Sequence, residues 1–236
     1  MSIYEPVRIF DPAGMALLMF DRTSYLASAC TSRSVLHVGC SDFPITVERL
    51  ADQTLLHEKL SKVCSRLVGI DNSREGIRSL EERGFTNVLC MDAEDMALSE
   101  TFDVVLAGDV LEHMSNPGLF LEGARHILNP SGRLIIGVPN AYSFNIVKYV
   151  CGGSEPTHKD HTYYFSVKTL SQLCSRYQLM PTRLVFTAQP DDPYETALYR
   201  IARRTLIKMA KTLAPSLIIE FQHESSVDLC QYFEWT

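Results

Sequence analysis

Val35-Leu-His-Val-Gly-Cys-Ser-Asp-Phe-Pro44 and Val68-Gly-Ile-Asp71 are the two stretches that decide the fold of this 236-residue chain. The first predicts a short buried strand that turns at Gly39, and the second predicts a strand that ends on a carboxylate. Neighbouring parallel strands bring such a turn and such a carboxylate to the same edge of a sheet, where nucleosides bind. We therefore expect Gly39 to let a ligand approach the backbone, and Asp71 to accept hydrogen bonds from a ribose diol.

The glycine pattern of this turn departs from that of a dinucleotide site. Only the first glycine is present, because Ser41 and Phe43 stand where further glycines are expected. A pyrophosphate must pack tightly against the backbone at a helix start, so this loss argues against NAD and FAD. A nucleoside without phosphates is less demanding, and S-adenosylmethionine (SAM) is such a ligand.

Further motifs follow in order along the chain. They are Gly69-Ile-Asp71-Asn72-Ser73, Cys90-Met-Asp92-Ala93, Phe102 to His113, Gly132 to Asn140, and His158 to Ser166. With the first turn, they make residues 33–190 resemble a class I SAM-dependent methyltransferase. The stretch that starts at His158 resembles the subgroup that includes ubiquinone-type and sugar-tailoring methyltransferases.

The resemblance implies a Rossmann-like, doubly wound α/β sheet of about seven strands, mostly parallel, with an antiparallel last strand and a helical insertion before it. The alternation of short apolar runs with helical patterns also favours a parallel sheet covered on both faces. We expect a single domain. Its parts are a leading helical segment 1–32, a cofactor-binding core 33–190, a helical insertion 191–215, and a last strand with a tail 216–236.

The apolar spacing predicts the individual elements. Helices are expected at 11–29 and 45–64, and after the N-caps Ser73, Asn116 and Ser166. The last two strands are expected to form an antiparallel edge. The predicted strands are 34–38, 66–70, 87–91, 103–107, 133–138, 182–188 and 216–222.

The resemblance also assigns a cofactor site. The first turn would hold the methionine end of SAM, Asp71 the ribose and Asp92 the adenine amino group, while Asp109 would lie near the methyl group. Two departures matter: His37 stands where the family usually has an acid, and Ser41 where it has a glycine. The cofactor-binding set is His37, Gly39, Cys40, Ser41, Asp71, Asn72, Asp92, Ala93 and Asp109.

The candidate catalytic residues are His113, His158, His161 and Asp109. His113 can act as a general base near neutral pH, or it can serve only to orient its loop. The stretch with His158 and His161 has three interpretations: it ties a loop to the sheet, it supplies a base, or it binds a divalent metal. No further ligand is evident, so we assign no metal ligand from the sequence.

Composition restricts the partners. The net charge of −6 gives no basic field for nucleic acid. No apolar run approaches about 20 residues, and the N-terminus shows no signal-peptide pattern. The seven cysteines are scattered without a C-x-x-C pair, which is typical of reduced thiols in the cytoplasm. The oligomeric state is not predicted.

Residues 194–213 predict an amphipathic helix within the insertion. Arg200, Arg204, Lys208 and Lys211 make one basic stripe, and apolar residues lie largely on the other side. A solvated face is the simplest interpretation. The alternatives are contact with a membrane surface, and attraction of an acceptor that carries phosphate or carboxylate.

We therefore predict a SAM-dependent methyltransferase that acts on a small molecule, at an oxygen of a sugar, a glycan precursor or another biosynthetic intermediate. One alternative is a non-catalytic or regulatory protein with a degenerate cofactor loop. Another is a protein methyltransferase, whereas the acidic balance disfavours RNA. The acceptor class rests on analogy with the fold.

Overall fold

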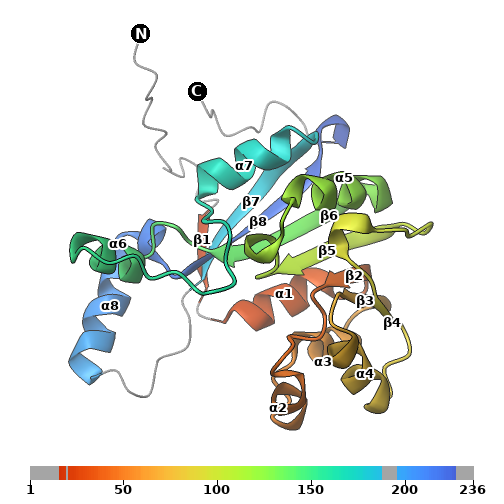
Figure 1. The fold of residues 1–236 in the computed structure, drawn as a ribbon. Helices are drawn as coiled ribbons and strands as arrows, with labels where there is room; N and C mark the ends of the chain where they lie inside the picture. Colours follow the sequence, from red (N-terminus) through yellow and green to blue (C-terminus); the bar gives the residue numbers. More distant parts are fainter. Residues whose placement is uncertain (1–15, 20, 188–195, 227–236) are drawn as a thin grey trace.

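An eight-stranded sheet forms the centre of the molecule, in the order β1-β7-β8-β6-β5-β2-β3-β4 (Figure 1). The computed structural model describes residues 16–19, 21–187 and 196–226. The strands are β1 Ala16–Met19, β2 Ser34–Val38, β3 Arg66–Asp71, β4 Val88–Cys90, β5 Phe102–Gly108, β6 Leu128–Pro139, β7 Leu179–Thr187 and β8 Ser216–His223. The predicted doubly wound α/β sheet is confirmed, with one strand more than expected.

Helices occupy most of the connections between these strands. The α-helices are α1 Arg22–Cys30, α2 Thr46–Ala51, α3 Leu56–Ser61, α4 Arg74–Glu82, α5 Pro117–Ile127, α6 Phe144–Cys151, α7 Val167–Ser175 and α8 Ala197–Met209. Short 3-10 turns are η1 Ala93–Asp95, η2 Leu111–His113, η3 Lys211–Leu213 and η4 Glu224–Ser226. The predicted strands start within three residues of the sequence-based expectations, except β6, which starts at Leu128 although its strand was predicted over 133–138.

The last strand is antiparallel, as predicted, but it does not lie at an edge. β8 inserts between β6 and β7 and pairs antiparallel with both. The edge is β1, which pairs in parallel with β7. The sequence pattern gave no sign of this order, because a strand buried on both sides and an edge strand can share the same apolar run.

The predicted leading helix at 11–29 is wrong in its first half. Of that range, residues 16–19 form β1, and the helix starts only at Arg22. Residues 11–15 and 20 lie outside the described part of the chain. Asp21 is the reason for the late start, because its carboxylate accepts the N–H of Ser24 and caps α1.

The expected helix over 45–64 is divided into α2 and α3. The break lies at residues 52–55, where Gln53 has a φ of 56°. The apolar positions of both halves still face the protein, since Leu50 and Leu60 are buried. Periodicity therefore located the buried side correctly but missed the break.

The predicted caps hold their helices. Ser73 accepts the N–H of Gly76 at 3.0 Å, and Asn116 accepts the N–H of Gly118 at 3.2 Å. Ser166 makes a reciprocal capping box with Thr169. These caps position the turns that follow β3, β5 and β6, which are the turns that form the candidate site.

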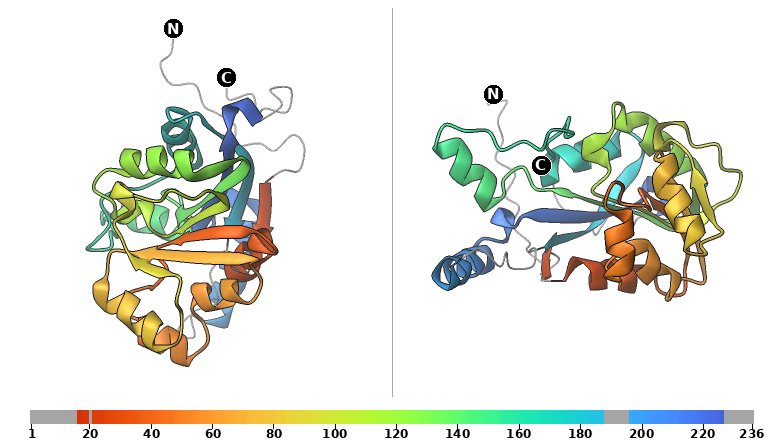
Figure 2. Two further views of the ribbon diagram at one scale, coloured as in Figure 1. Left: turned by 90° about the vertical axis from the view of Figure 1, so that its right-hand side faces the viewer. Right: turned by 60° about the horizontal axis from the view of Figure 1, so that its bottom comes forward.

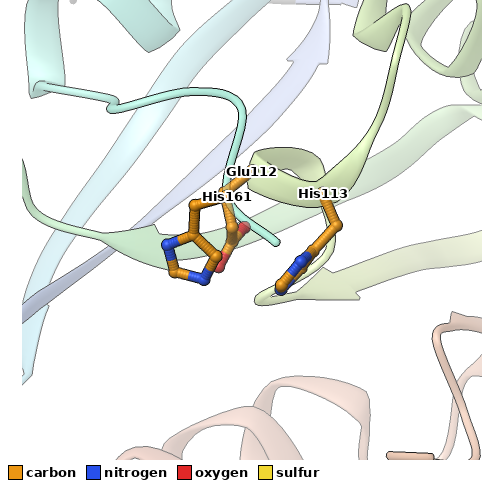
Figure 3. A group of neighbouring side chains, drawn as sticks. All are labelled: Glu112, His113 and His161. Carbon is orange, nitrogen blue, oxygen red and sulfur yellow. The ribbon is translucent and has the colours of Figure 1, made fainter. Parts of the chain in front are cut away.

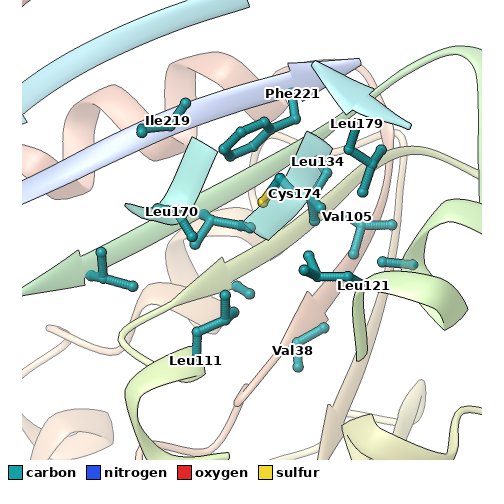
Figure 4. Close-up of a cluster of buried hydrophobic side chains, with 14 of the residues drawn as sticks. Val38, Val105, Leu111, Leu121, Leu134, Leu170, Cys174, Leu179, Ile219 and Phe221 are labelled. Atoms are coloured by element: carbon teal, nitrogen blue, oxygen red, sulfur yellow. The ribbon is translucent and has the colours of Figure 1, made fainter. Parts of the chain in front are cut away.

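Two apolar layers cover the sheet. On one face, residues of α5 and α7 such as Leu121 and Leu170 pack on Val38 and Val105 (Figure 4). On the other face, Leu26 of α1 and Leu60 of α3 pack on alternate strand positions. The views in Figure 2 show helices on both sides of the sheet. Among the described residues, no helix is both long and apolar enough to cross a bilayer.

Candidate cofactor and catalytic site

The turn after β2 requires its glycine. Gly39 has a φ of 71°, and a Cβ there would approach Val110 Cγ2 to 2.6 Å. The N–H groups of Gly39 and Cys40 donate to the carbonyl of Ile70 at 2.9 and 3.2 Å. The turn is therefore fixed to β3. The Cys40 thiol is buried, and burial raises its pKa, so it does not form a nucleophilic thiolate.

Asp71 ends β3 beside this turn, as the sequence predicts. Its Oδ2 accepts the N–H and the hydroxyl of Ser41 at 3.0 and 2.7 Å. Its Oδ1 accepts the N–H of Ser73 at 2.9 Å. A carboxylate has about four acceptor positions, so the protein uses most of them and leaves about one for a ligand.

Asp92 follows β4, the neighbour of β3 in the sheet. Its Oδ1 accepts the N–H of Glu94 at 2.9 Å, which caps the turn η1 that starts at Ala93. In the predicted set, Asn72 lies between Asp71 and the capping Ser73, and its carbonyl accepts the Cys90 thiol at 3.8 Å. The residues predicted to bind adenosine therefore share one edge of the sheet.

His37 lies away from this edge, beneath the turn. It is buried and stacks on His57, with ring centroids 5.4 Å apart and the two Nδ1 atoms 3.2 Å apart. Burial, and next the partner ring, hold the pKa of His37 well below its usual value. Burial lowers the pKa of His57 to about 4. The His37–His57 pair is therefore neutral. It does not supply the negative charge of the acidic residue that the family usually has at the position of His37.

Arg22 completes a charged group that the sequence analysis missed. Its guanidinium forms an ion pair with Asp109 and lies over Gly108 and Gly137, where a Cβ would meet it at 3.0 and 2.6 Å. The Nε atom is buried and has no hydrogen-bond partner. The only sequence signal was its place as first residue of a capped helix.

Asp109 has a φ of 56°, which is strained for a residue with a side chain. Its N–H donates to the carbonyl of Gly137 at 2.8 Å, so the pairing of β5 with β6 maintains this conformation. Asp42 faces the same group: burial raises its pKa, Arg49 opposes that rise, and Asp109 adds to it. Opposite charges thus meet where the carboxyl ends of β2 and β5 adjoin.

Glu112, His113 and His161 form the candidate catalytic cluster (Figure 3). One ligand-type atom from each lies within 4.8 Å of the others. Glu112 is only 1% exposed, and neither carboxylate oxygen has a hydrogen-bond partner. Burial, and next the Asp109 carboxylate, raise the pKa of Glu112 to about 8. The sequence analysis did not include Glu112 among its candidate site residues.

The two imidazoles come from different segments. His113 Nδ1 lies 3.1 Å from the carbonyl of Asp160, which can only accept, so in the neutral imidazole Nδ1 carries the proton and Nε2 keeps its lone pair. Burial, and next His113, lower the pKa of His161. His158 is exposed, with its ring 4.9 Å from that of His161. The structure thus brings the two predicted histidine stretches together.

The segment with His161 is tied to η2 by its backbone. Thr162 donates its N–H to the carbonyl of Glu112 at 2.8 Å, and its hydroxyl donates to the carbonyl of Met114 at 2.9 Å. Tyr163 donates its hydroxyl to the carbonyl of Ser115 at 3.2 Å. These bonds tie the loop to η2 and the residues that follow it, and they bring His161 to the candidate cluster.

The cluster has the composition to hold a divalent cation. Two imidazoles and a carboxylate suit zinc and other transition metals. A metal-binding histidine commonly donates its other N–H to a carbonyl, as His113 does.

The edge as a whole also fits an adenosine: Asp92 has an unengaged oxygen, Asp71 retains about one acceptor position, and Gly39 leaves the turn open.

Comparison with known sequences identifies part of the chain. Residues 53–136 match the family described as a methyltransferase domain. Ubiquinone biosynthesis O-methyltransferase of Nitrobacter winogradskyi is 26% identical over 141 residues, covering 58% of this chain and 50% of that protein. The same enzyme of Parvibaculum lavamentivorans is 34% identical over 110 residues, covering 42% and 44%. The chain spans about half the length of the curated relatives it matches.

Solved structures extend the likeness over most of the fold. The N-methyltransferase NodS of Bradyrhizobium japonicum WM9, in complex with S-adenosyl-L-homocysteine (SAH), gives a TM-score of 0.54 at 15% identity, covering 85% of this chain and 83% of that one. A SAM-dependent methyltransferase of Archaeoglobus fulgidus gives 0.55 at 17% identity, covering 84% and 89%. The chain therefore contains a segment that matches a methyltransferase domain, and its sheet has the fold of SAM-dependent methyltransferases of known structure.

Proposed function

We propose that this chain transfers a methyl group from SAM to an oxygen of a small-molecule acceptor. The observation that carries the proposal is the buried, unpartnered carboxylate of Glu112 beside His113 and His161, at the same sheet edge as Asp71. A buried polar group without a partner is costly to maintain. Its persistence beside two imidazoles is typical of a site that handles protons or cations.

The cofactor assignment is supported by the order of the edge residues. Asp71 accepts from the ribose and Asp92 from the adenine amino group, since adjacent strands β3 and β4 present them side by side. The charged group of Arg22, Asp42 and Asp109 suits the zwitterionic methionine end: Arg22 binds the carboxylate and an aspartate binds the ammonium. The relatives named above are O-methyltransferases of ubiquinone biosynthesis.

The chain's own residues need to do little chemistry. SAM supplies an electrophilic methyl group when bound, and the protein must hold the acceptor oxygen in line and take its proton. Orientation alone can contribute about 7–11 kcal/mol. The Nε2 lone pair of His113 accepts the acceptor's proton. The positive charge of the resulting imidazolium favours the ionised form of Glu112, which then stabilises that imidazolium. In the alternative arrangement, Glu112, His113 and His161 would hold a cation, which would lower the pKa of the acceptor hydroxyl.

The acceptor is the finer part of the proposal. The resemblance of residues 158–166 to a sugar-tailoring subgroup supports an oxygen of a sugar, a glycan precursor or another biosynthetic intermediate. A phosphate or carboxylate on that acceptor would be attracted by the cations of α8 if the acceptor approaches from that side. The location in the cytoplasm remains the expectation stated from the cysteine pattern.

A non-catalytic protein is the second candidate function. Ser41 takes two acceptor positions of Asp71, and the neutral His37–His57 pair replaces an acid. Both features would weaken cofactor binding. This candidate predicts no measurable affinity for SAM or SAH.

Calorimetric titration with SAH tests the proposal. We expect wild type to bind in the micromolar range and Asp71→Ala to lose at least about tenfold in affinity, since a hydrogen bond to a charged acceptor is worth about 1.5–3 kcal/mol. Asp52→Ala, at the exposed end of α2, is the matched control and should bind as wild type does. Absence of binding by wild type would favour the non-catalytic candidate.

A further inference from the structure

Glu94 joins two turns that are distant from each other in the sequence. It is the middle residue of η1, the turn that follows β4 and that Asp92 caps. One of its carboxylate oxygens accepts the N–H of Ser115, and the other accepts the N–H of Asn116, each at 2.7 Å. Hydrogen bonds to an ionised acceptor are among the strong ones. The side chain of Glu94 therefore fixes the segment after η2 to the turn after β4.

The first end of this connection is the carboxylate proposed to bind adenine. Asp92 Oδ1 accepts the backbone N–H of Glu94 at 2.9 Å, and the Asp92 carbonyl accepts the N–H of Asp95 at 3.1 Å. The turn thus uses Oδ1, whereas Oδ2 is left for a ligand. An adenine amino group on Asp92 would therefore bind the same carboxylate that holds the backbone of Glu94.

The second end of the connection is the candidate catalytic cluster. Ser115 lies two residues after His113 in the chain. The carbonyl of Ser115 accepts the hydroxyl of Tyr163 at 3.2 Å, and Tyr163 lies two residues after His161. The two segments that carry the imidazoles therefore meet at Ser115, whose N–H is held by Glu94.

Capping of α5 does not account for this arrangement. Asn116 already caps that helix with its own side chain, which accepts the N–H of Gly118 at 3.2 Å. The helix also packs closely on the segment after η1, since a Cβ at Gly123 would approach Met96 Cε to 2.8 Å. The helix is thus capped and packed by other groups, and the Glu94 carboxylate acts on the segment that links η2 to it.

We propose that Glu94 is a positioning residue, which holds the cluster of Glu112, His113 and His161 in place relative to the adenine of the bound cofactor. This role rests on the proposed function, because it takes Asp92 as the adenine ligand and the cluster as the group that handles the acceptor's proton. Methyl transfer in line tolerates little misplacement, since a shift of about 1 Å can cost about 10²-fold in rate. A direct bond between the cofactor turn and the cluster's segment limits such a shift.

NMR of the imidazole signals with adenosine as the ligand tests this role. Adenosine lacks the methionine end, so it occupies the edge at Asp92 without extending to the cluster. We expect saturating adenosine to shift the signals of His113 and His161 in wild type. In Glu94→Gln these shifts should be at least about fivefold smaller, because one end of a carboxamide is a donor and cannot accept an N–H. Affinity for adenosine should stay within about twofold, since Asp92 is retained.

Asn116→Ala is the matched control for the helix. It removes the side-chain cap of α5 but keeps both N–H groups that Glu94 accepts, so adenosine should shift the imidazole signals as in wild type. The proposal would be overturned by equal shifts in wild type and Glu94→Gln, by no shift in saturated wild type, or by loss of the shifts in both variants.

The ligand-free protein separates this role from the proposed function. Glu94→Gln should alter the imidazole signals of His113 and His161 without any ligand. Asp95→Asn, which removes the same charge from an exposed residue of the same turn, should leave them unchanged. Unchanged signals in Glu94→Gln, or equal changes in the two variants, would contradict the positioning role. Absence of SAH binding by wild type in calorimetry would reject the proposed function instead, and the ligand-free signals would still decide the role of Glu94.

Discussion

Ser41 is the residue at which this chain differs most consequentially from the methyltransferase family that it resembles. Its hydroxyl is fully buried, donates to Asp71 and lies against Gly76, where a Cβ would approach it to 2.2 Å. The serine thus uses acceptor capacity that a ribose would need. The hydroxyl of Ser41 also stabilises the turn in the absence of a ligand. The turn is therefore preformed, but its affinity for the cofactor is lower.

Replacing Ser41 by Gly should strengthen cofactor binding. The change removes the hydroxyl that donates to Asp71 and so frees one acceptor position for the ribose diol, while the backbone N–H of residue 41 remains. One such bond can raise SAH affinity by about tenfold. Calorimetry measures the change. Ser41→Ala removes the same hydroxyl and keeps the same backbone N–H, so it should give a similar gain. Unchanged affinity in both variants would mean that Asp71 does not contact the ribose.

Glu112→Gln should lower kcat by about 10²–10⁴-fold and leave the affinity for SAH unchanged, because Glu112 lies at the acceptor side of the edge. The steady-state rate with a competent acceptor and calorimetry with SAH provide the two readouts. Dialysis against a chelator then separates the two roles of the cluster. An imidazole base keeps its activity, whereas a cation site loses activity and recovers it with Mg²⁺ or Zn²⁺. A full rate in Glu112→Gln would exclude both roles.

At the scale of elements, capping residues determine where the site's turns begin. Ser73 caps α4 with its hydroxyl and donates its backbone N–H to Asp71. The same turn therefore stabilises the start of the helix and positions the carboxylate proposed to bind the ribose. Helix α6 is different. Ser143 accepts the N–H of Ile146 at 3.3 Å and caps a helix that has no buried side chain. The two caps therefore have similar geometry but stabilise very different units of the fold.

Ser73→Ala should lower the free energy of unfolding by about 1 kcal/mol, the usual cost of an N-cap. Ser143→Ala should lower it by less than about 0.5 kcal/mol, because α6 can open locally while the core stays folded. Urea denaturation at equal slope measures both. Equal losses in the two variants would show that α6 is part of the cooperative core.

At the scale of the whole molecule, the buried His37–His57 pair couples stability to pH. An unfolded histidine takes up a proton near pH 6.5, whereas burial holds the pKa of His57 at about 4 in the folded state. Between these values the unfolded state binds more protons, so stability falls as the pH falls. His57 alone contributes its full stabilisation only above about pH 6.5.

The free energy of unfolding should fall by about 2 kcal/mol between pH 7.5 and pH 5 from His57 alone, since one pKa unit corresponds to about 1.4 kcal/mol. Urea denaturation across this range measures the slope. His57→Gln keeps a polar side chain but cannot titrate, so its slope should be shallower by that amount. An identical slope in wild type and variant would mean that folding does not lower the pKa of His57.

Local signals in the sequence located most of the elements. The alternating apolar runs predicted β2, β3 and β5 to within a residue or so, and Ser73 and Asn116 marked their helices. Residues in contact with their chain neighbours carry this information themselves. The division of 45–64 into two helices was missed, because a break at Gln53 depends on a φ value that the pattern does not encode.

The sequence by itself determined the doubly wound sheet, the turn at Gly39 and the carboxylate at Asp71, since each follows from residue type and short-range spacing. Only the tertiary structure decided that β8 lies inside the sheet, that Arg22 reaches Asp109, and that Glu112 meets His161. These contacts join residues far apart along the chain. Their partners are selected by the packing of whole elements against one another, which no local pattern records.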